Sequence, residues 1–205
     1  MIIYFIENEK IYTYKLPSVP SGNYILHDYD QNNNNHIKYD TSNNHKEAII
    51  LIGSPGSGKS TFCENNLTTK GYIRINQDTL KTREKVIKCM EQNLKEGKNI
   101  VIDSTNPQKN GRIEFIKICK KYGYYVRAFN LDIPKELAMH LNNLRSINKN
   151  RKHLSGYVNA IPIHSFYKNY EEPSKNEGFD EIVKVNFVPG PFVNEEDKKI
   201  FYYLS

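Results

Sequence analysis

The 205-residue sequence has few cysteines and no long apolar run. Its three cysteines, Cys63, Cys89 and Cys119, form no CxxC pair, which argues against a disulfide-stabilised secreted domain and favours a reducing intracellular compartment, nuclear or cytoplasmic. The longest apolar stretches, residues 1–6 and 48–52, fall far short of the ~20 residues of a membrane-spanning helix. No basic segment precedes the first stretch, so we expect no secretory signal and no membrane partner.

Acidic residues are scarce in the middle of the chain. Residues 81–152 hold 17 Lys and Arg against 7 Asp and Glu, whereas residues 171–205 hold 4 against 8, within a net charge of +6. A basic block of this kind suits a phosphate-rich partner, either a nucleotide or a nucleic acid. Solvated helix faces explain the same charge equally well, so charge alone leaves the choice open.

Alternating strand and helix patterns from residue 47 onward predict the fold class. Continuous apolar runs predict buried strands, and apolar residues at helical spacing between them predict helices, one of them over residues 79–95. The expected strands are residues 48–52, 71–76, 99–103, 124–131 and 181–187. This order predicts an α/β domain over residues 47–205, with a parallel five-stranded sheet and helices on both faces.

Residues 1–46 differ from the rest of the chain. Residues 11–16 predict a short strand, but prolines, Gly22 and the asparagine run 32–35 break any longer element. We therefore expect an N-terminal extension whose last part, about residues 28–46, is a flexible polar linker.

Residues 53–60 carry the clearest motif. Gly-Ser-Pro-Gly-Ser-Gly-Lys-Ser matches GxxxxGK[ST] in full, directly after an expected strand and before a helix that begins near Lys59. Such a loop cradles phosphate oxygens with backbone N–H groups, while Lys59 reaches the β- and γ-phosphates and the Ser60 hydroxyl ligates Mg²⁺. The predicted ligand is ATP with Mg²⁺, and the expected nucleotide-binding residues are Gly53, Ser54, Pro55, Gly56, Ser57, Gly58, Lys59, Ser60 and Thr61.

Two carboxylates follow the next two expected strands. Ligands of open α/β sheets collect at the carboxyl ends of the strands, where Asp78 and Asp103 would lie. Asp78 either accepts the proton of an acceptor hydroxyl or caps the following helix. Asp103 either holds the Mg²⁺ shell, as a Walker B aspartate does, or closes an Asx-turn. Spacing leaves both choices open.

Taken together and in this order, these segments resemble the kinase domain of the polynucleotide 5′-hydroxyl kinases, and of the polynucleotide kinase/phosphatase repair proteins in particular. The phosphate loop is generic, whereas NQDTL (76–80), IDSTNP (102–107), IPIHSFYKNYEEP (161–173) and EGF (177–179) are specific. The resemblance implies a P-loop kinase fold with a helical lid. It also implies transfer of the γ-phosphate of ATP to 5′-hydroxyl ends of DNA or RNA, in end repair.

The resemblance assigns roles to individual residues. It implies that Asp78 is the general base for the 5′-hydroxyl and that Asp103 belongs to the active centre. Lys85 and Arg112 correspond to positions that contact nucleic-acid phosphates. Arg145 corresponds to the lid arginine on the ATP phosphates, a position suited to stabilising charge in the transition state.

The sequence also departs from the family. Relatives often have a second lid arginine where this chain has Leu141 and Asn143, and Arg151 and Lys152 are the expected substitutes. The family's repair enzymes carry a phosphatase domain ahead of the kinase, and residues 1–46 are too few for one. We therefore expect no 3′-phosphatase activity from this sequence.

Two alternative functions remain at this level. A small-molecule P-loop kinase would share the phosphate loop, but the basic block and the specific motifs argue against it. A non-catalytic, ATP-dependent nucleic-acid-binding module is disfavoured because Lys59, Ser60, Asp78 and Arg145 are all present. The preference between DNA and RNA and the oligomeric state stay open.

Overall fold

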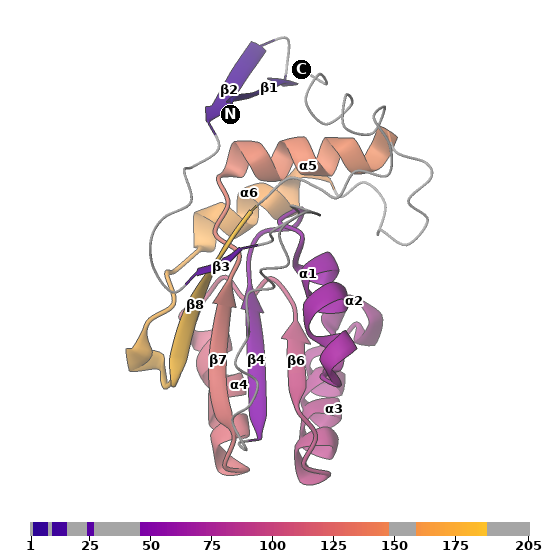
Figure 1. Ribbon diagram of the computed structural model, residues 1–205, viewed down its shortest axis with the longest axis vertical. Coiled ribbons are helices and arrows are strands. Elements are labelled where there is room, and N and C mark those ends of the chain that lie inside the picture. The colour runs from indigo at the N-terminus through magenta and orange to yellow at the C-terminus, as the bar shows by residue number, and fades with distance from the viewer. Residues whose placement is uncertain (1, 8–9, 16–23, 27–45, 148–158, 188–205) are drawn as a thin grey trace, which may run out of the picture.

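The computed structural model describes residues 2–7, 10–15, 24–26, 46–147 and 159–187. Its body is a parallel sheet of six strands in the order β3-β8-β7-β4-β6-β5 (Figure 1). The strands are β3 (Tyr24–Leu26), β4 (Glu47–Ile52), β5 (Ile73–Asn76), β6 (Ile100–Asp103), β7 (Tyr125–Asn130) and β8 (Glu181–Asn186). Separately, β1 (Ile2–Glu7) pairs with β2 (Lys10–Lys15) as an antiparallel hairpin.

Helices connect these strands. They are α1 (Lys59–Asn66), α2 (Gln77–Leu80), α3 (Arg83–Lys95), α4 (Lys109–Lys121), α5 (Lys135–Ile147) and α6 (Ala160–Asn169), with the 3₁₀ turns η1 (Thr68–Lys70) and η2 (Lys175–Glu177). None of the helices in the described part of the chain is both long and apolar enough to cross a membrane.

The predicted five parallel strands are all present, so the α/β fold class is confirmed. The strand expected over residues 11–16 corresponds to β2. The sixth strand, β3, was not predicted; it comes from the N-terminal extension and pairs with the outer edge of β8. The linker expected over residues 28–46 falls outside the described residues except at its last position.

The helix expected over residues 79–95 is wrong in one respect, because the structure splits this segment into α2 and α3. Lys81 adopts a φ of 68°, a conformation that a helix does not allow. Thr82 then starts the second helix as its N-cap, its side chain accepting from the Lys85 N–H at 3.4 Å. The break leaves Asp78 on a short, separate helix at the end of β5.

The sheet is buried on both faces, which explains why the apolar run of β4 is continuous rather than alternating. Ile50 faces a core that includes residues of α3 and α4. Its neighbours Ile49 and Leu51 face the opposite core, which includes Phe62 and Cys63 of α1. All the residues of β4 are buried, so the strand that precedes the phosphate loop is fixed from both sides.

The topology makes the carboxyl end of β4 the expected place for a ligand. From this central strand the chain runs first to β5 and β6 on one side and then to β7 and β8 on the other. Ligands of open α/β sheets bind where the strand order reverses in this way. In Figure 1 the arrowheads of β4, β6 and β7 point toward α5 and α6, which pack on each other through an apolar cluster of their own.

Candidate active site

The phosphate loop joins β4 to α1, as its motif predicts. Gly56 and Gly58 both have a φ of 88°, which glycine adopts readily and other residues do not. A Cβ on Gly56 would lie 2.7 Å from the backbone oxygen of Ala138. Position 56 therefore requires glycine for two reasons, the positive φ of its backbone and the close approach of α5.

The loop offers polar groups to a phosphate. Gly58 occupies the N-cap of α1 and supplies no side-chain cap, so the first N–H groups of this helix are not bonded by a capping side chain. The buried Ser57 Oγ makes no hydrogen bond within the described part of the chain. Thr61 lies exposed on α1. These features fit a bound triphosphate.

Lys59 lies against the loop that it follows. Its Nζ donates hydrogen bonds to the backbone oxygens of Gly53 at 2.9 Å and Ser54 at 2.7 Å. The residue is only 8% exposed, so its ammonium is kept at the loop rather than in solvent. A positive charge held there is suited to the phosphates of a nucleotide.

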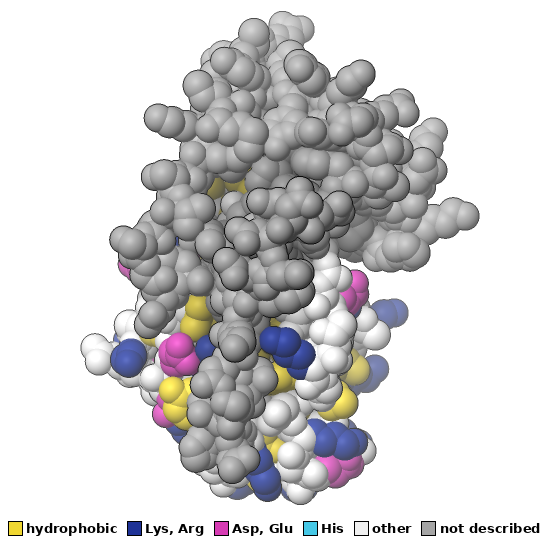
Figure 2. Space-filling model, viewed as in Figure 1, with side chains coloured by type: hydrophobic (Ala, Val, Ile, Leu, Met, Phe, Trp, Pro, Cys, Tyr) yellow, Lys and Arg dark blue, Asp and Glu magenta, His cyan; other side chains and the backbone are white. Residues whose placement is uncertain are grey.

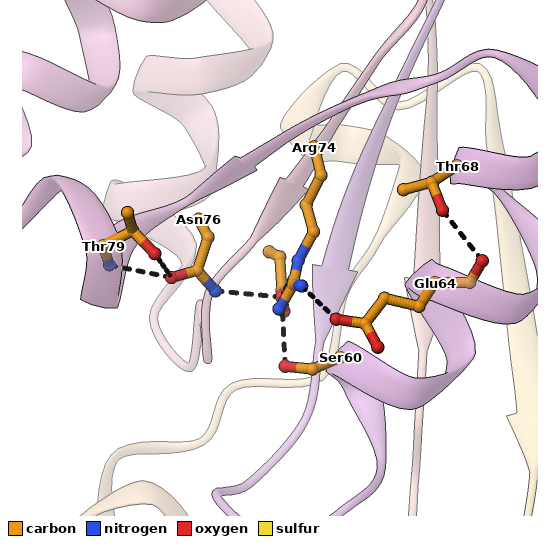
Figure 3. Close-up of polar contacts among 7 residues, drawn as sticks. Ser60, Glu64, Thr68, Arg74, Asn76 and Thr79 are labelled. Atoms are coloured by element: carbon orange, nitrogen blue, oxygen red, sulfur yellow. Dashed lines mark hydrogen bonds and ion pairs between the residues drawn. The ribbon is translucent and has the colours of Figure 1, made fainter. Parts of the chain in front are cut away.

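Asp103, at the end of β6, accepts hydrogen bonds from three side chains, those of Ser60, Arg74 and Asn76, which Figure 3 labels. Its Oδ2 accepts hydrogen bonds from Ser60 Oγ at 3.1 Å and from Asn76 Nδ2 at 3.0 Å. The same oxygen accepts from Arg74 Nε at 2.8 Å and Arg74 Nη2 at 2.5 Å. The structure therefore brings together the two residues, Ser60 and Asp103, that the sequence nominated for a metal.

The oxygens of Ser60 and Asp103 are a donor set that suits Mg²⁺. Magnesium prefers hard oxygen ligands and usually takes only one or two from the protein, the rest coming from phosphates and water. Within the described ranges, no group of three or more His, Cys, Asp or Glu side chains could hold a metal by itself. The pair thus fits a metal shared with a nucleotide, not a closed structural metal site.

Asp78 lies in the first turn of α2 with its side chain exposed. The cap of this helix is Asn76, whose Oδ1 accepts from the Thr79 N–H at 2.8 Å and from Thr79 Oγ1 at 3.0 Å. The alternative that Asp78 caps the helix is therefore wrong. In the part of the chain that the structure describes, the Asp78 carboxylate has no polar partner, which leaves it accessible to a substrate.

Arg112 does not lie where the resemblance placed it. The residue is 0% exposed, and its Nε and Nη2 each donate to Glu177 at 2.7 Å. Its Nη1 donates to the backbone oxygens of Asn106 at 3.1 Å and Pro107 at 2.8 Å. The expectation that Arg112 contacts nucleic-acid phosphates is thus corrected, because the guanidinium is committed to fastening the loop after β6 to η2.

Arg112→Ala is expected to lower the free energy of unfolding by about 3–5 kcal/mol, since it leaves the Glu177 carboxylate buried without its partner. Urea denaturation followed by circular dichroism measures this. The matched control is Lys98→Ala, which removes a pair with Glu96 whose side chains are 48% and 44% exposed and costs at most ~1 kcal/mol. Equal stability of the two variants would show that the buried pair contributes no more than the exposed one.

Two further predicted residues keep their roles as predictions. Lys85 is exposed on the first turn of α3, a position open to a substrate. Arg145 lies near the end of α5, where the structure describes the helix but not this side chain. Arg151 and Lys152 lie outside the described residues.

The basic block is partly neutralised by its neighbours. Among its members, Arg83 pairs with Glu114 at 2.6 Å, and Lys120 pairs with Asp180. On the face shown in Figure 2, the described Lys and Arg side chains lie among Asp and Glu side chains rather than in one patch. Overall charge is therefore a weaker indicator of a nucleic-acid partner than the individual residues around the phosphate loop.

Sequence reasoning missed several residues that contact this site, among them Arg74 and Tyr167. Arg74 alternates with Ile73 and Ile75, a pattern that predicts only a polar strand face. The Tyr167 hydroxyl donates to the backbone oxygen of Ile133 at 2.7 Å and lies 3.2 Å from Ser54 Oγ, and burial raises its pKa to about 12. Tyr167 thus ties α6 to the phosphate loop as a neutral phenol. Its place in residues 161–173, a family-specific stretch, was the available signal.

Comparisons with known proteins agree with this site. A family model described as an AAA domain matches residues 49–88. The chain is 37% identical over 165 residues to the bifunctional polynucleotide phosphatase/kinase of Schizosaccharomyces pombe. The aligned segment covers 80% of this chain and 38% of that protein. It is 40% identical over 155 residues to a relative from Acanthamoeba polyphaga mimivirus that is also named for both activities, covering 74% of this chain and 36% of the relative.

A solved structure supports the fold. A gluconokinase from Sinorhizobium meliloti aligns with a TM-score of 0.52 at 14% identity, over 77% of this chain and 90% of that one. This similarity identifies a P-loop kinase fold and nothing finer. The chain spans about two fifths of the length of the two curated relatives. Over that span its sequence is 37–40% identical to proteins named as bifunctional polynucleotide phosphatase/kinases.

Proposed function

We propose that this chain is an ATP-dependent polynucleotide 5′-hydroxyl kinase, with residues 47–205 as its kinase domain and the 5′-hydroxyl ends of DNA or RNA as acceptors. The observation that carries the proposal is the arrangement at the carboxyl edge of the sheet. Ser60 Oγ lies 3.1 Å from Asp103 Oδ2 beside the phosphate loop, and the adjacent strand end presents the exposed Asp78. Similarity to the phosphatase/kinases supports the acceptor class.

Binding of the nucleotide falls to the phosphate loop and the start of α1. The N–H groups of the loop hold the phosphate oxygens, and Lys59 exchanges its two backbone acceptors for the β- and γ-phosphates. Ser60 and Asp103 would hold Mg²⁺, which when bound supplies positive charge to the phosphates. Arg145 adds positive charge from the lid helix.

Phosphoryl transfer then requires a base at the acceptor. As the 5′-hydroxyl oxygen forms its bond to the γ-phosphorus, the bond between that phosphorus and the bridging oxygen of ADP breaks. Asp78 accepts the proton of the hydroxyl, which fits its exposed position in the first turn of α2. The products are the 5′-phosphorylated end and ADP.

The direct test is transfer of label from γ-labelled ATP to a panel of 5′-hydroxyl DNA and RNA oligonucleotides. Matched oligonucleotides that already carry a 5′-phosphate are the control, and sugar acceptors represent the small-molecule alternative. Labelling of the 5′-hydroxyl oligonucleotides alone is the expected result. Labelling of a sugar with none on any oligonucleotide would replace the proposed function by a small-molecule kinase.

Lys85→Gln is expected to reduce the salt dependence of oligonucleotide binding. Each phosphate neutralised on a single strand contributes a slope of about −0.7 in log K against log salt. Fluorescence anisotropy at several salt concentrations should therefore give the variant a slope shallower by about 0.7. Lys117→Gln removes a charge that is also exposed, from α4, and should leave the slope unchanged. If the plots of log K against log salt have the same slope for the parent, Lys85→Gln and Lys117→Gln, Lys85 does not contact the oligonucleotide.

A further inference from the structure

Arg74 joins three elements around the phosphate loop. It projects from β5, and its guanidinium donates two hydrogen bonds to Asp103 at the end of β6. Its Nη1 lies 2.5 Å from Glu64 Oε1, one turn after Ser60 on α1 (Figure 3). The side chain therefore touches both the carboxylate and the helix that form the candidate metal site.

The charges of this cluster are unequally exposed. The side chain of Asp103 is 2% exposed, that of Arg74 25% and that of Glu64 53%. A charge in water is strongly screened, whereas a buried one acts on its neighbours with little screening. Glu64 therefore contributes little to the local field, and Arg74 is the cation that balances the buried carboxylate of Asp103.

This balance matters for a ligand whose own charge is strongly negative. Without a cation, Asp103 repels the phosphates of ATP; with Arg74 in contact, the pair is close to neutral. Mg²⁺ responds in the opposite sense, because the Asp103 carboxylate attracts it and the guanidinium repels it. Arg74 also occupies Oδ2, the oxygen that lies beside Ser60.

We propose, on the basis of the function proposed above, that Arg74 is a positioning residue that balances the charge of Asp103 and so allows ATP to bind before the metal. It weakens the thermodynamic coupling between ATP and Mg²⁺. Coupling of this kind is the ratio of the ATP dissociation constants without and with the metal, and it is reciprocal between the two ligands.

The proposal predicts a change in ATP binding that is independent of turnover. Isothermal titration calorimetry measures the ATP dissociation constant in excess EDTA and again in saturating Mg²⁺. Arg74→Gln should weaken binding in EDTA and raise the ratio of the two constants by about tenfold, as one partly screened unit charge would. Arg74→Lys keeps the charge and should stay near the parent ratio.

Two other variants fix the sign of the effect. Asp103→Asn removes the negative charge while Arg74 stays, so ATP binding in EDTA should become tighter than in the parent. The double variant Arg74→Gln with Asp103→Asn is neutral again, so its affinity in EDTA should return toward the parent value. Arg83→Gln, which removes an arginine paired with Glu114 on α4, is the matched control and should leave the ratio unchanged.

The outcomes separate this inference from the proposed function. A parent protein that binds no ATP overturns both. If the parent binds ATP and transfers phosphate, but Arg74→Gln has the same ratio of ATP dissociation constants in EDTA and in Mg²⁺ as the parent, only the role of Arg74 is overturned. If thermal melting shows that Arg74→Gln does not fold, Asp103→Asn and the double variant provide the test. Equal affinities for ATP in EDTA in these two variants and the parent would then overturn the role of Arg74.

Discussion

Lys59→Ala is expected to reduce phosphate transfer by ~10²–10³-fold, the range typical of a preorganised charge that stabilises a transition state. The ammonium of Lys59 is held at the phosphate loop by two backbone oxygens, so it is in place before the nucleotide arrives. Initial rates with a labelled 5′-hydroxyl oligonucleotide at saturating ATP measure the loss. The effect should appear in the rate more than in the affinity for the oligonucleotide.

The fold of Lys59→Ala is expected to persist, because the core beside α1 rests on apolar residues such as Phe62 and Leu67 and not on the lysine. Circular dichroism and thermal melting check this. Lys95→Ala, which removes an exposed lysine from α3, is the control and should retain parental activity. Normal turnover in a folded Lys59→Ala protein would remove the assignment of the phosphate loop.

Most of the fold could be predicted because its signals are local in the sequence. A strand covered on both faces must be apolar throughout, so residues 48–52 indicated a central strand without any knowledge of their neighbours. Elements defined by tertiary pairing were missed. β3 is three residues long and belongs to the sheet only because it pairs with β8. The first turn of α6 contains an exposed Ile161 beside a proline, which conceals the helical pattern of this segment.

In the candidate site too, the residues marked by local sequence signals were predicted, and those that depend on distant partners were not. Ser60 and Asp103 could both be nominated for Mg²⁺ because each lies at or beyond the end of a parallel strand, and the carboxyl ends of such strands share one edge of the sheet. This rule needs only the order of the elements. Arg112 was misplaced because its partner Glu177 lies 65 residues away, and nothing in the local sequence shows that the two are buried together. Arg74 was missed for the same reason, since Asp103 is 29 residues away and belongs to another strand.

Asp78→Asn is the variant that tests the acceptor side of the site. Asparagine matches aspartate in size but cannot accept a proton, and a general base typically contributes ~10²–10⁴-fold to the rate. Transfer should therefore fall at least ~100-fold, the low end of that range. Because Asn76 caps α2 and Asp78 is exposed, the free energy of unfolding should change by no more than about 0.5 kcal/mol.

The affinity of Asp78→Asn for ATP should stay near the parent value, since Lys59, Ser60 and the backbone of the loop are untouched. Measuring rates across a range of Mg²⁺ concentrations separates a lost base from a metal-binding defect, because added metal restores only the latter. Glu84→Gln neutralises an exposed carboxylate in the first turn of α3 and should leave transfer unchanged. If Asp78→Asn phosphorylates 5′-hydroxyl ends as fast as the parent, the base lies elsewhere, and Asp103 becomes the next residue to test.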